Sequence, residues 1–238
     1  GIVSPHMKAA QQGSTIERLV QTGAHFAQVR SRRHPSMKPF VVGAKARFEI
    51  LDLSKTEAQL EAAKAALSAL AKDARTVLFV GGKAEVSQLV SSAAEKVNQP
   101  YVAGRWLGGT ISNFTEIKKR IDRLADLLQK RESGELTKLY TKLERVKIDR
   151  EIDRLADRLK GIEDLAKRPD ALLIVDPKHE AHATKEAKDA GIPVIAIMGS
   201  DNNLKDATYP IVANDASHDA VSYLLDELTA AFAEGKKA

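Results

Sequence analysis

Cysteine is absent from the 238 residues of this chain, and its absence removes several kinds of site at once. Disulfide frameworks, thiol nucleophiles, zinc ribbons and iron–sulfur clusters all need it. Long apolar runs are missing as well, because stretches such as Ala171–Val175 are far too short to cross a bilayer. With 43% hydrophobic and 29% charged residues, the usage of ordinary globular proteins, the sequence predicts a soluble protein with a substantial core and no membrane span.

The start of the chain lacks the apolar core of a signal peptide. Residues 1–6, which precede Met7, are expected to be a remnant of cloning rather than native sequence. They are left out of the expectations that follow.

Acidic residues are missing from residues 18–48, although seven basic residues occur there. A second basic region, residues 118–168, carries sixteen Lys and Arg against eleven Asp and Glu, which is as large an excess as the net charge of +5 on the whole chain. Fixed positive charge gathered in two places favours contact with a polyanion, because each neutralised phosphate releases condensed counterions. A solvated basic face or an acidic protein partner would give the same composition.

Short apolar runs rich in β-branched residues predict strands at residues 76–80, 171–175 and 193–197, with weaker candidates at 48–51 and 209–212. Helical patterns lie between them and beside them, at residues 54–72, 83–97, 177–190 and 217–233. Ser54 with Glu57 matches a capping box, and Asp176 before Pro177 matches a helix cap. Strands that alternate with helices predict an α/β fold with a doubly wound, mainly parallel sheet, flavodoxin-like or Rossmann-like.

The middle of the chain follows a different pattern. Apolar residues recur there in steps of three and four on both sides of a turn at residues 132–135, which marks a seam along two helices. The seam residues are Ile117, Ile121, Leu124, Leu128, Leu136, Leu139, Leu143 and Val146. We therefore expect residues 112–167 to form an antiparallel coiled-coil hairpin, inserted into an α/β domain made of residues 7–111 and 168–238.

Signals for catalysis or for a bound nucleotide are weak. Gly81, Gly82 and Lys83 follow a predicted strand, where backbone amides can cradle a phosphate, but the turn matches neither the P-loop nor the dinucleotide pattern. A nucleophile elbow of the Gly-x-Ser-x-Gly kind is absent. The sequence thus predicts no enzyme, no catalytic residues and no cofactor. An α/β nucleotide-binding protein or enzyme without a recognised catalytic motif is the alternative, and a coiled-coil adaptor that binds protein alone is another.

A metal site is also weighed and set aside. His179 and His182 stand three residues apart at the start of a predicted helix, so both could face one ion. A third ligand, such as His218, would have to come from elsewhere in the chain. Exposed polar residues on an amphipathic helix are the better interpretation, and no metal ligands are predicted.

Two further segments have distinctive compositions. One is a candidate contact for nucleic acid, and the other is expected to lie at the base of the helical hairpin, called the arm below. Residues 30–40 are basic, contain two prolines and lack periodicity, which predicts an extended loop whose guanidinium groups pair with phosphates. Residues 105–114 hold the only tryptophan beside Arg105 and a pair of glycines. We expect Trp106 to be a core anchor at the base of the arm, and Asn113 with Glu116 to cap its first helix.

At this point the sequence resembles a known family. The runs RWLGGTISNF at residues 105–114, RPDALLIVDP at 168–177 and GIPVIA at 191–196 are similar to the bacterial S-two family of small-subunit ribosomal proteins. Four further motifs agree in order and spacing: GAHF at 23–26, MKPF at 37–40, ILDLSKT at 50–56 and VLFVG at 77–81. The resemblance covers about residues 15–233.

The resemblance implies a structural role without catalysis, on the ribosome in the cytoplasm. Its implied partners are small-subunit ribosomal RNA, the S-one protein involved in messenger RNA capture and neighbouring small-subunit proteins. Combined with the basic segments, it predicts RNA contacts at Arg30, Arg32, Arg33, His34, Lys38, Arg47, Arg105, Lys118 and Lys119. Three loops depart from the family pattern, at residues 25–28, 198–204 and 213–217. We expect these departures to affect loops rather than strand cores.

Overall fold

The computed structural model describes residues 14–238. The expected cloning remnant, residues 1–6, and the first residues of the predicted α/β domain lie outside this range. Within the described part of the chain no helix combines the length and the apolar character needed to cross a bilayer.

A five-stranded parallel sheet forms the centre of the molecule, and the sequence predicts every one of its strands except the one at residues 101–102. It contains β4 (Val77–Val80), β5 (Tyr101–Val102), β6 (Ala171–Val175), β7 (Val194–Met198) and β8 (Tyr209–Val212). Their spatial order is β5-β4-β6-β7-β8, with every neighbouring pair parallel. Counted along the chain, this is the order 2-1-3-4-5 of flavodoxin-like sheets, in which the direction of winding reverses between the first and third strands, here β4 and β6.

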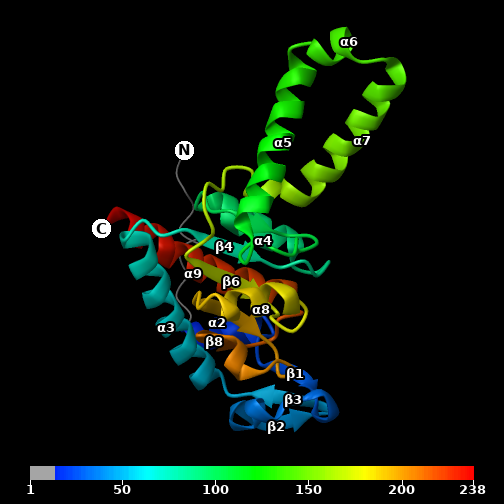
Figure 1. Cartoon of the computed structure of the whole chain (residues 1–238). Coiled ribbons are helices and arrows are strands. Elements are labelled where there is room, and N and C mark those ends of the chain that lie inside the picture. Colours follow the sequence, from blue (N-terminus) through cyan, green and yellow to red (C-terminus); the bar gives the residue numbers. More distant parts are fainter. Residues whose placement is uncertain (1–13) are drawn as a thin grey trace, which may run out of the picture.

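Helices cover both faces of this sheet (Figure 1). They are α2 (Thr15–Gln21), α3 (Leu53–Lys72), α4 (Ser87–Lys96), α8 (Ala181–Asp189) and α9 (His218–Lys237). Side chains alternate along each strand, so Val77 and Phe79 pack with α3, α4 and α9 in one apolar cluster. Leu78 and Val80 face the opposite side, toward α8 and the base of the helical arm. Burial on both sides explains why the strands read as continuous apolar runs.

A second, smaller sheet was not expected from the sequence. It joins β1 (Phe26–Val29), β3 (Phe48–Leu51) and β2 (Val41–Lys45) in the antiparallel order β1-β3-β2. The weak strand candidate at residues 48–51 is confirmed, but it belongs to this sheet rather than to the parallel one. Val42, Phe26 and Phe48 are exposed, and β2 holds a glycine, so the hydrophobic pattern that marks a half-buried strand is faint here.

Two predicted helix caps are wrong by a few residues. α3 begins one residue before Ser54, and its cap is Asp52, whose carboxylate accepts a hydrogen bond from Ser54 N at 3.0 Å. α8 begins only at Ala181, and its cap position is Glu180. Asp176 instead adopts a left-handed conformation with φ 61°, and its carboxylate accepts from His179 N at 3.3 Å in the turn that precedes α8. The predicted helix at residues 217–233 is confirmed as α9, and Ser217 caps it, since its hydroxyl accepts from Ala220 N at 3.3 Å.

The helical arm consists of α5 (Phe114–Glu132), the short α6 (Glu135–Leu139) and α7 (Lys142–Leu159), followed by the 3-10 turn η3 (Lys160–Ile162). α5 and α7 run in opposite directions and project from the sheet domain (Figure 1). Near the base, Ile117, Ile121 and Ile152 are buried. Farther out, the predicted seam residues Leu139, Leu143 and Val146 are exposed. Helix α6 ends before Tyr140, whose backbone is extended. Thr141 and Glu144 then form a capping box at the start of α7.

Candidate nucleic-acid interface

The basic segment at residues 30–40 is not the extended loop that the sequence predicts. It folds into two 3-10 turns, η1 (Arg30–Arg32) and η2 (Pro35–Phe40). His34 lies at the start of η2, where its Nδ1 accepts a hydrogen bond from Ser36 N at 3.2 Å, and Pro35 suits the first position. The backbone is therefore ordered into turns that fix where each basic side chain leaves the surface.

A distant loop, residues 199–204, holds this segment in place. The backbone N–H of His34 donates to the carbonyl of Ser200 at 2.8 Å, and Gln28 N donates to the Ser200 hydroxyl at 3.0 Å. Leu204 N donates to the Ser36 hydroxyl at 2.9 Å. These bonds join segments about 170 residues apart in the chain, so the position of the basic segment depends on the tertiary fold.

The predicted RNA-contacting residues of this region divide into two kinds. Arg30, Arg32, Lys38 and Arg47 are exposed. Arg33 is largely covered, because its guanidinium lies 2.8 Å from the buried carboxylate of Glu49. His34 is half-buried. Arg33 and His34 therefore shape the segment, while the exposed cations are available to a partner.

The remaining predicted contacts lie at the base of the arm, at the other end of the sheet domain (Figure 1). Arg105 is exposed in the loop after β5. Lys118 and Lys119, in the first turns of α5, pair with Asp122 at 2.9 Å and with Glu116 at 2.8 Å. The structure thus does not gather the nine predicted residues into one site. It places them in two separate regions, one beside the small sheet and one beside the arm.

The carboxyl ends of β4 and β6, where flavodoxin-like sheets bind ligands, contain a buried charged cluster. Lys83 Nζ lies 3.0 Å from Asp176 Oδ2 and 3.4 Å from Asp215 Oδ1. Asn202 is fully buried beside them and donates to Asp176 Oδ1 at 3.1 Å. Burial and the charge of Asp176 raise the pKa of Asp215 to about 7, against the opposing effect of Lys83. Burial alone would lower the pKa of Lys83, but the two carboxylates outweigh it and raise the pKa.

This cluster uses the groups that a phosphate would need. Gly82 N, an amide of the glycine turn, donates to Glu180 Oε1 at 2.7 Å. A side chain at Gly82 would also meet the carbonyl of Gly104, so the turn is closely packed. Because Lys83 is bound to two aspartates of its own chain, the turn is filled from within. This arrangement argues against the nucleotide-binding alternative.

The histidine pair at the start of α8 does not converge with further ligands. Within residues 14–238, no group of three or more His, Asp or Glu side chains is arranged to hold a metal ion. His179 Nδ1 lies 3.1 Å from Glu180 Oε1, and His182 is exposed.

The run at residues 105–114 is fixed by one carboxylate that the sequence did not single out. Glu186 accepts hydrogen bonds from Gly109 N at 3.0 Å, Ser112 N at 3.1 Å and the indole N–H of Trp106. Burial would raise the pKa of Glu186, but these hydrogen bonds outweigh it and lower the pKa. Trp106 is 9% exposed and belongs to the apolar cluster at the base of the arm, as predicted. Asn113 occupies the cap position of α5, but its side chain makes no capping bond.

Comparison with known proteins agrees with these features. Residues 19–235 match the family model described as Ribosomal protein S2. The chain is 37% identical over 223 residues to the small ribosomal subunit protein uS2 of Coprothermobacter proteolyticus, covering 94% of this chain and 83% of that one. It is 36% identical to uS2 of Dictyoglomus thermophilum, covering 93% and 89%, and 35% identical to uS2 of Salinibacter ruber, covering 93% and 69%. The resemblance drawn from the sequence is confirmed: the chain belongs to the ribosomal protein S2 family, whose members are structural components of the small ribosomal subunit and not enzymes.

Proposed function

We propose that this protein binds small-subunit ribosomal RNA, with the exposed cations of residues 30–38 as its first contact. The observation that carries the proposal is the state of Arg30, Arg32 and Lys38. All three are exposed, and none has an ion-pair partner among residues 14–238. They lie on a backbone segment fixed by Ser200.

The electrostatics of this segment favour a phosphate backbone over a neutral partner. No acidic residue occurs in residues 18–48, and Glu49, the first one after this stretch, is already paired with Arg33. Cations that are held near one another without counter-ions repel, and a polyanion relieves the repulsion while releasing its condensed ions. Contacts of this kind position a protein by shape and charge and are largely independent of base sequence.

The test replaces Arg30, Arg32 and Lys38 together by alanine. Arg33 is left in place, because removing it would strand the buried Glu49 carboxylate and disturb the fold. The matched control replaces Lys72, Arg75 and Lys96, three exposed cations at the end of α3, in the loop that follows it and at the end of α4. We expect the first variant to bind small-subunit RNA more weakly and with a flatter salt dependence than the control. Equal affinity and equal salt slope in the two variants would contradict the proposal.

The arm completes this proposed role. We propose that residues 112–167 act as a coiled-coil hairpin inserted between the two parts of the α/β domain, residues 7–111 and 168–238, and that Arg105, Lys118, Lys119 and Arg47 add RNA contacts. With basic regions at both ends of the sheet domain, the protein would bridge RNA elements of the small subunit. The charge distribution supports this proposal, since residues 118–168 carry an excess of five basic residues.

We further propose that this protein works on the ribosome in the cytoplasm, beside neighbouring small-subunit proteins, and supports translation by recruiting the S-one protein. The family assignment supports this part of the proposal. Small subunits assembled with and without this chain should differ in how much S-one protein they retain after sedimentation. Equal retention of the S-one protein would contradict recruitment and would leave the proposed RNA binding untouched.

A further inference from the structure

The tip of the arm, which projects away from the sheet domain, carries exposed apolar side chains (Figure 1). Within residues 14–238, four of the nine exposed large hydrophobic residues fall between residues 139 and 146. Leu143 is 67% exposed and Val146 is 42% exposed, both in the first turns of α7. Aliphatic side chains in water lack the stabilisation that burial gives, and a cluster of them is typical of a surface that a partner covers.

Apolar residues occupy two opposite sides of α7. Ile148 and Ile152 form the inner stripe, which packs in the apolar cluster at the base of the arm. An α-helix turns by about 100° per residue, so Val146 points about 160° away from Ile148, and Leu143 about 140° away. Leu143 and Val146 therefore form an outer stripe, which cannot face α5 while the inner stripe does.

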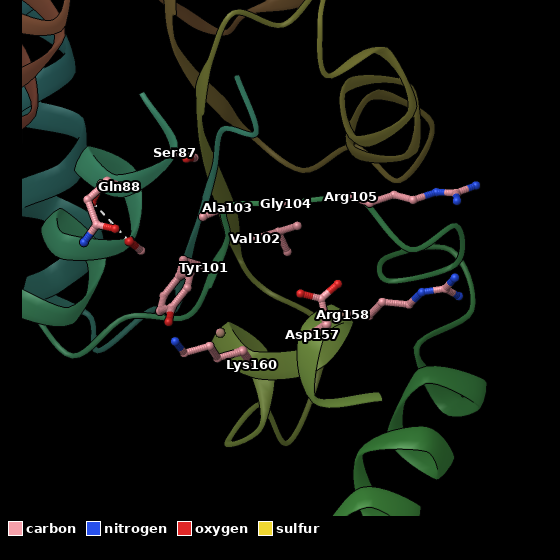
Figure 2. Close-up of a pocket in the computed structure, with 12 residues that line it drawn as sticks. Ser87, Gln88, Tyr101, Val102, Ala103, Gly104, Arg105, Asp157, Arg158 and Lys160 are labelled. Carbon is pink, nitrogen blue, oxygen red and sulfur yellow. Dashed lines mark hydrogen bonds between the residues drawn. The ribbon is translucent and has the colours of Figure 1, made fainter. Parts of the chain in front are cut away.

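The base of the arm prevents α7 from turning to bury the outer stripe. Leu159, at the end of α7, is fully buried. Gly161 of η3 packs so closely on β5 that a side chain there would collide with the carbonyl oxygen of Tyr101. Figure 2 shows Lys160 beside Tyr101 at this junction between the arm and the sheet. Rotation of α7 would break these contacts, so the outer stripe stays uncovered by residues 14–238.

Cations flank the outer stripe. Lys142, Lys147 and Arg150 are exposed, and none of them makes an ion pair within the described part of the chain. By the same helical rotation, Lys142 and Lys147 border the stripe on its two sides, and Arg150 continues it toward the base of the arm. Glu144, in the same turn, is used by the helix cap, where its carboxylate accepts from Thr141 N at 2.8 Å. The outer face of α7 thus combines an apolar centre with uncompensated positive charge.

We infer that this outer face, centred on Leu143 and Val146, docks an amphipathic helix of another protein that carries Asp or Glu beside its apolar stripe. A helix with apolar residues three and four positions apart matches the spacing of the outer stripe. Its carboxylates pair with the cations on both sides, as charges that flank a coiled-coil seam do. RNA satisfies only the cations, because its phosphates leave aliphatic side chains in water and its bases stack on aromatic ones. The inference goes beyond the proposed RNA binding, because it assigns a protein contact to the tip.

The experiment places the photo-cross-linking amino acid benzoylphenylalanine at residue 146 of the full chain and illuminates living cells that contain it. Mass spectrometry then identifies the cross-linked peptide, which we expect to come from another protein and to contain Asp or Glu. L143S should lower the cross-link yield at least about fivefold, because burial of one leucine side chain is worth about tenfold or more in affinity. K142A/R150A should lower the yield as well. The matched control K72A/K96A, which removes exposed cations at the ends of α3 and α4, should not.

Four results would overturn the inference. A cross-link to RNA would make the outer face part of the RNA interface, and a cross-link to a second copy of this chain would make it a dimer contact. A yield no higher than with benzoylphenylalanine at Ala65, an exposed position of α3, would show that the outer stripe stays in water. A yield that K142A/R150A left unchanged would exclude recognition of an acidic helix.

The proposed RNA binding is judged by a separate measurement. L143S should bind deproteinised small-subunit ribosomal RNA with wild-type affinity and unfold at the wild-type urea midpoint, because Leu143 is exposed. If R30A/R32A/K38A weakens RNA binding but no protein is cross-linked at residue 146, only the protein contact is wrong. If the acidic peptide is captured but the wild type binds no RNA, only the proposed function fails.

Discussion

Lys83 and Asp176 form an ion pair of 3.0 Å across the point where the parallel sheet reverses its winding, between β4 and β6. The ammonium group is 3.4 Å from a second carboxylate, Asp215, which lies 132 residues away in the sequence. Asp215 accepts a hydrogen bond from Gly199 N at 2.8 Å, and the next residue, Ser200, holds the basic segment. The place where related sheets bind a ligand is therefore used here to fix a loop that positions residues 28–36.

Replacing Lys83 by methionine should destabilise the protein by about 3 kcal/mol, because it leaves two buried carboxylates without their cation. Urea unfolding near pH 8 measures this change. Lys185→Met is the matched control: Lys185 pairs with Asp189 at 2.7 Å, but both side chains are exposed, so its loss should cost at most about 0.5 kcal/mol. Equal costs for the two variants would mean that the buried cluster contributes nothing beyond a surface pair.

The elevated pKa of Asp215 makes a prediction about pH. Its pKa is about 7 in the fold and 3.8 as the ordinary value, so between these limits folding takes up a proton. The favourable contribution of this group is complete below about pH 4 and is lost as the pH rises through about 7. We therefore expect the stability of Asp215→Asn, relative to wild type, to increase between pH 5 and pH 8.

Urea unfolding of both proteins at pH 5, 6, 7 and 8 checks this expectation, because titratable groups outside this cluster contribute equally to the two curves. The charges that face Asp215 are Asp176, Lys83 and Asp201, and all three are kept in the variant. A constant difference across this range would show that Asp215 does not titrate there. If the wild type instead gained stability relative to Asp215→Asn as the pH rose, the pKa of Asp215 would be lowered in the fold rather than raised.

Much of the parallel sheet could be predicted from the sequence, because β4, β6 and β7 are continuous apolar runs bounded by turn residues. The small sheet could not, since β2 and β3 leave Val42 and Phe48 exposed and carry little hydrophobic pattern. The arm illustrates a local signal that was present but missed. Thr141 and Glu144 form a capping box, which marks a new helix start and breaks the seam that a continuous helix would carry through Leu139 and Leu143.

The candidate interface was predictable in composition but not in arrangement. The basic residues could be identified, but the pairing of Arg33 with Glu49 depends on β3 lying beside the segment, which no local pattern encodes. Lys83, Asp176 and Asp215 come together only through the order of the strands. Glu186 stands in an ordinary polar helix, so its bonds to Gly109 and Ser112, 74 to 77 residues away, left no mark in the sequence.

Glu186 should be essential for the position of Trp106. Its carboxylate accepts from the indole N–H and from two backbone amides. Glu186→Ala therefore leaves two partly buried donors, the indole N–H and Gly109 N, without a partner and should cost about 1 to 3 kcal/mol. Because Trp106 is the only tryptophan, its fluorescence reports the site directly, and we expect a red-shifted emission as the indole gains water. Glu116→Ala, which removes an exposed carboxylate in α5, should leave the emission unchanged.

The arm should separate into a tip that is dispensable for folding and a base that is not. Leu139, Leu143 and Val146 are exposed near the tip, whereas Ile117, Ile121 and Ile152 pack in the same apolar cluster as Leu78 and Val80 of the sheet. Replacing residues 129–149 by a short Gly-Ser linker removes one buried side chain, Leu136, and should therefore lower the free energy of unfolding by at most about 3 kcal/mol. Replacing residues 118–168 should expose the sheet and lower the urea midpoint severely, because it removes many buried side chains at once.

Urea unfolding and RNA binding of the two truncated proteins distinguish folding from recognition. The shorter deletion keeps Arg105, Lys118 and Lys119, so it should retain the proposed RNA contacts at the base of the arm while losing the basic residues of the tip. A longer deletion that unfolded at the wild-type urea concentration would show that the arm is an independent domain. An exposed leucine buries little apolar surface, so its removal should hardly change stability. If the shorter deletion nevertheless unfolded at a much lower urea concentration than the wild type, the tip would be needed for folding and this prediction would be wrong.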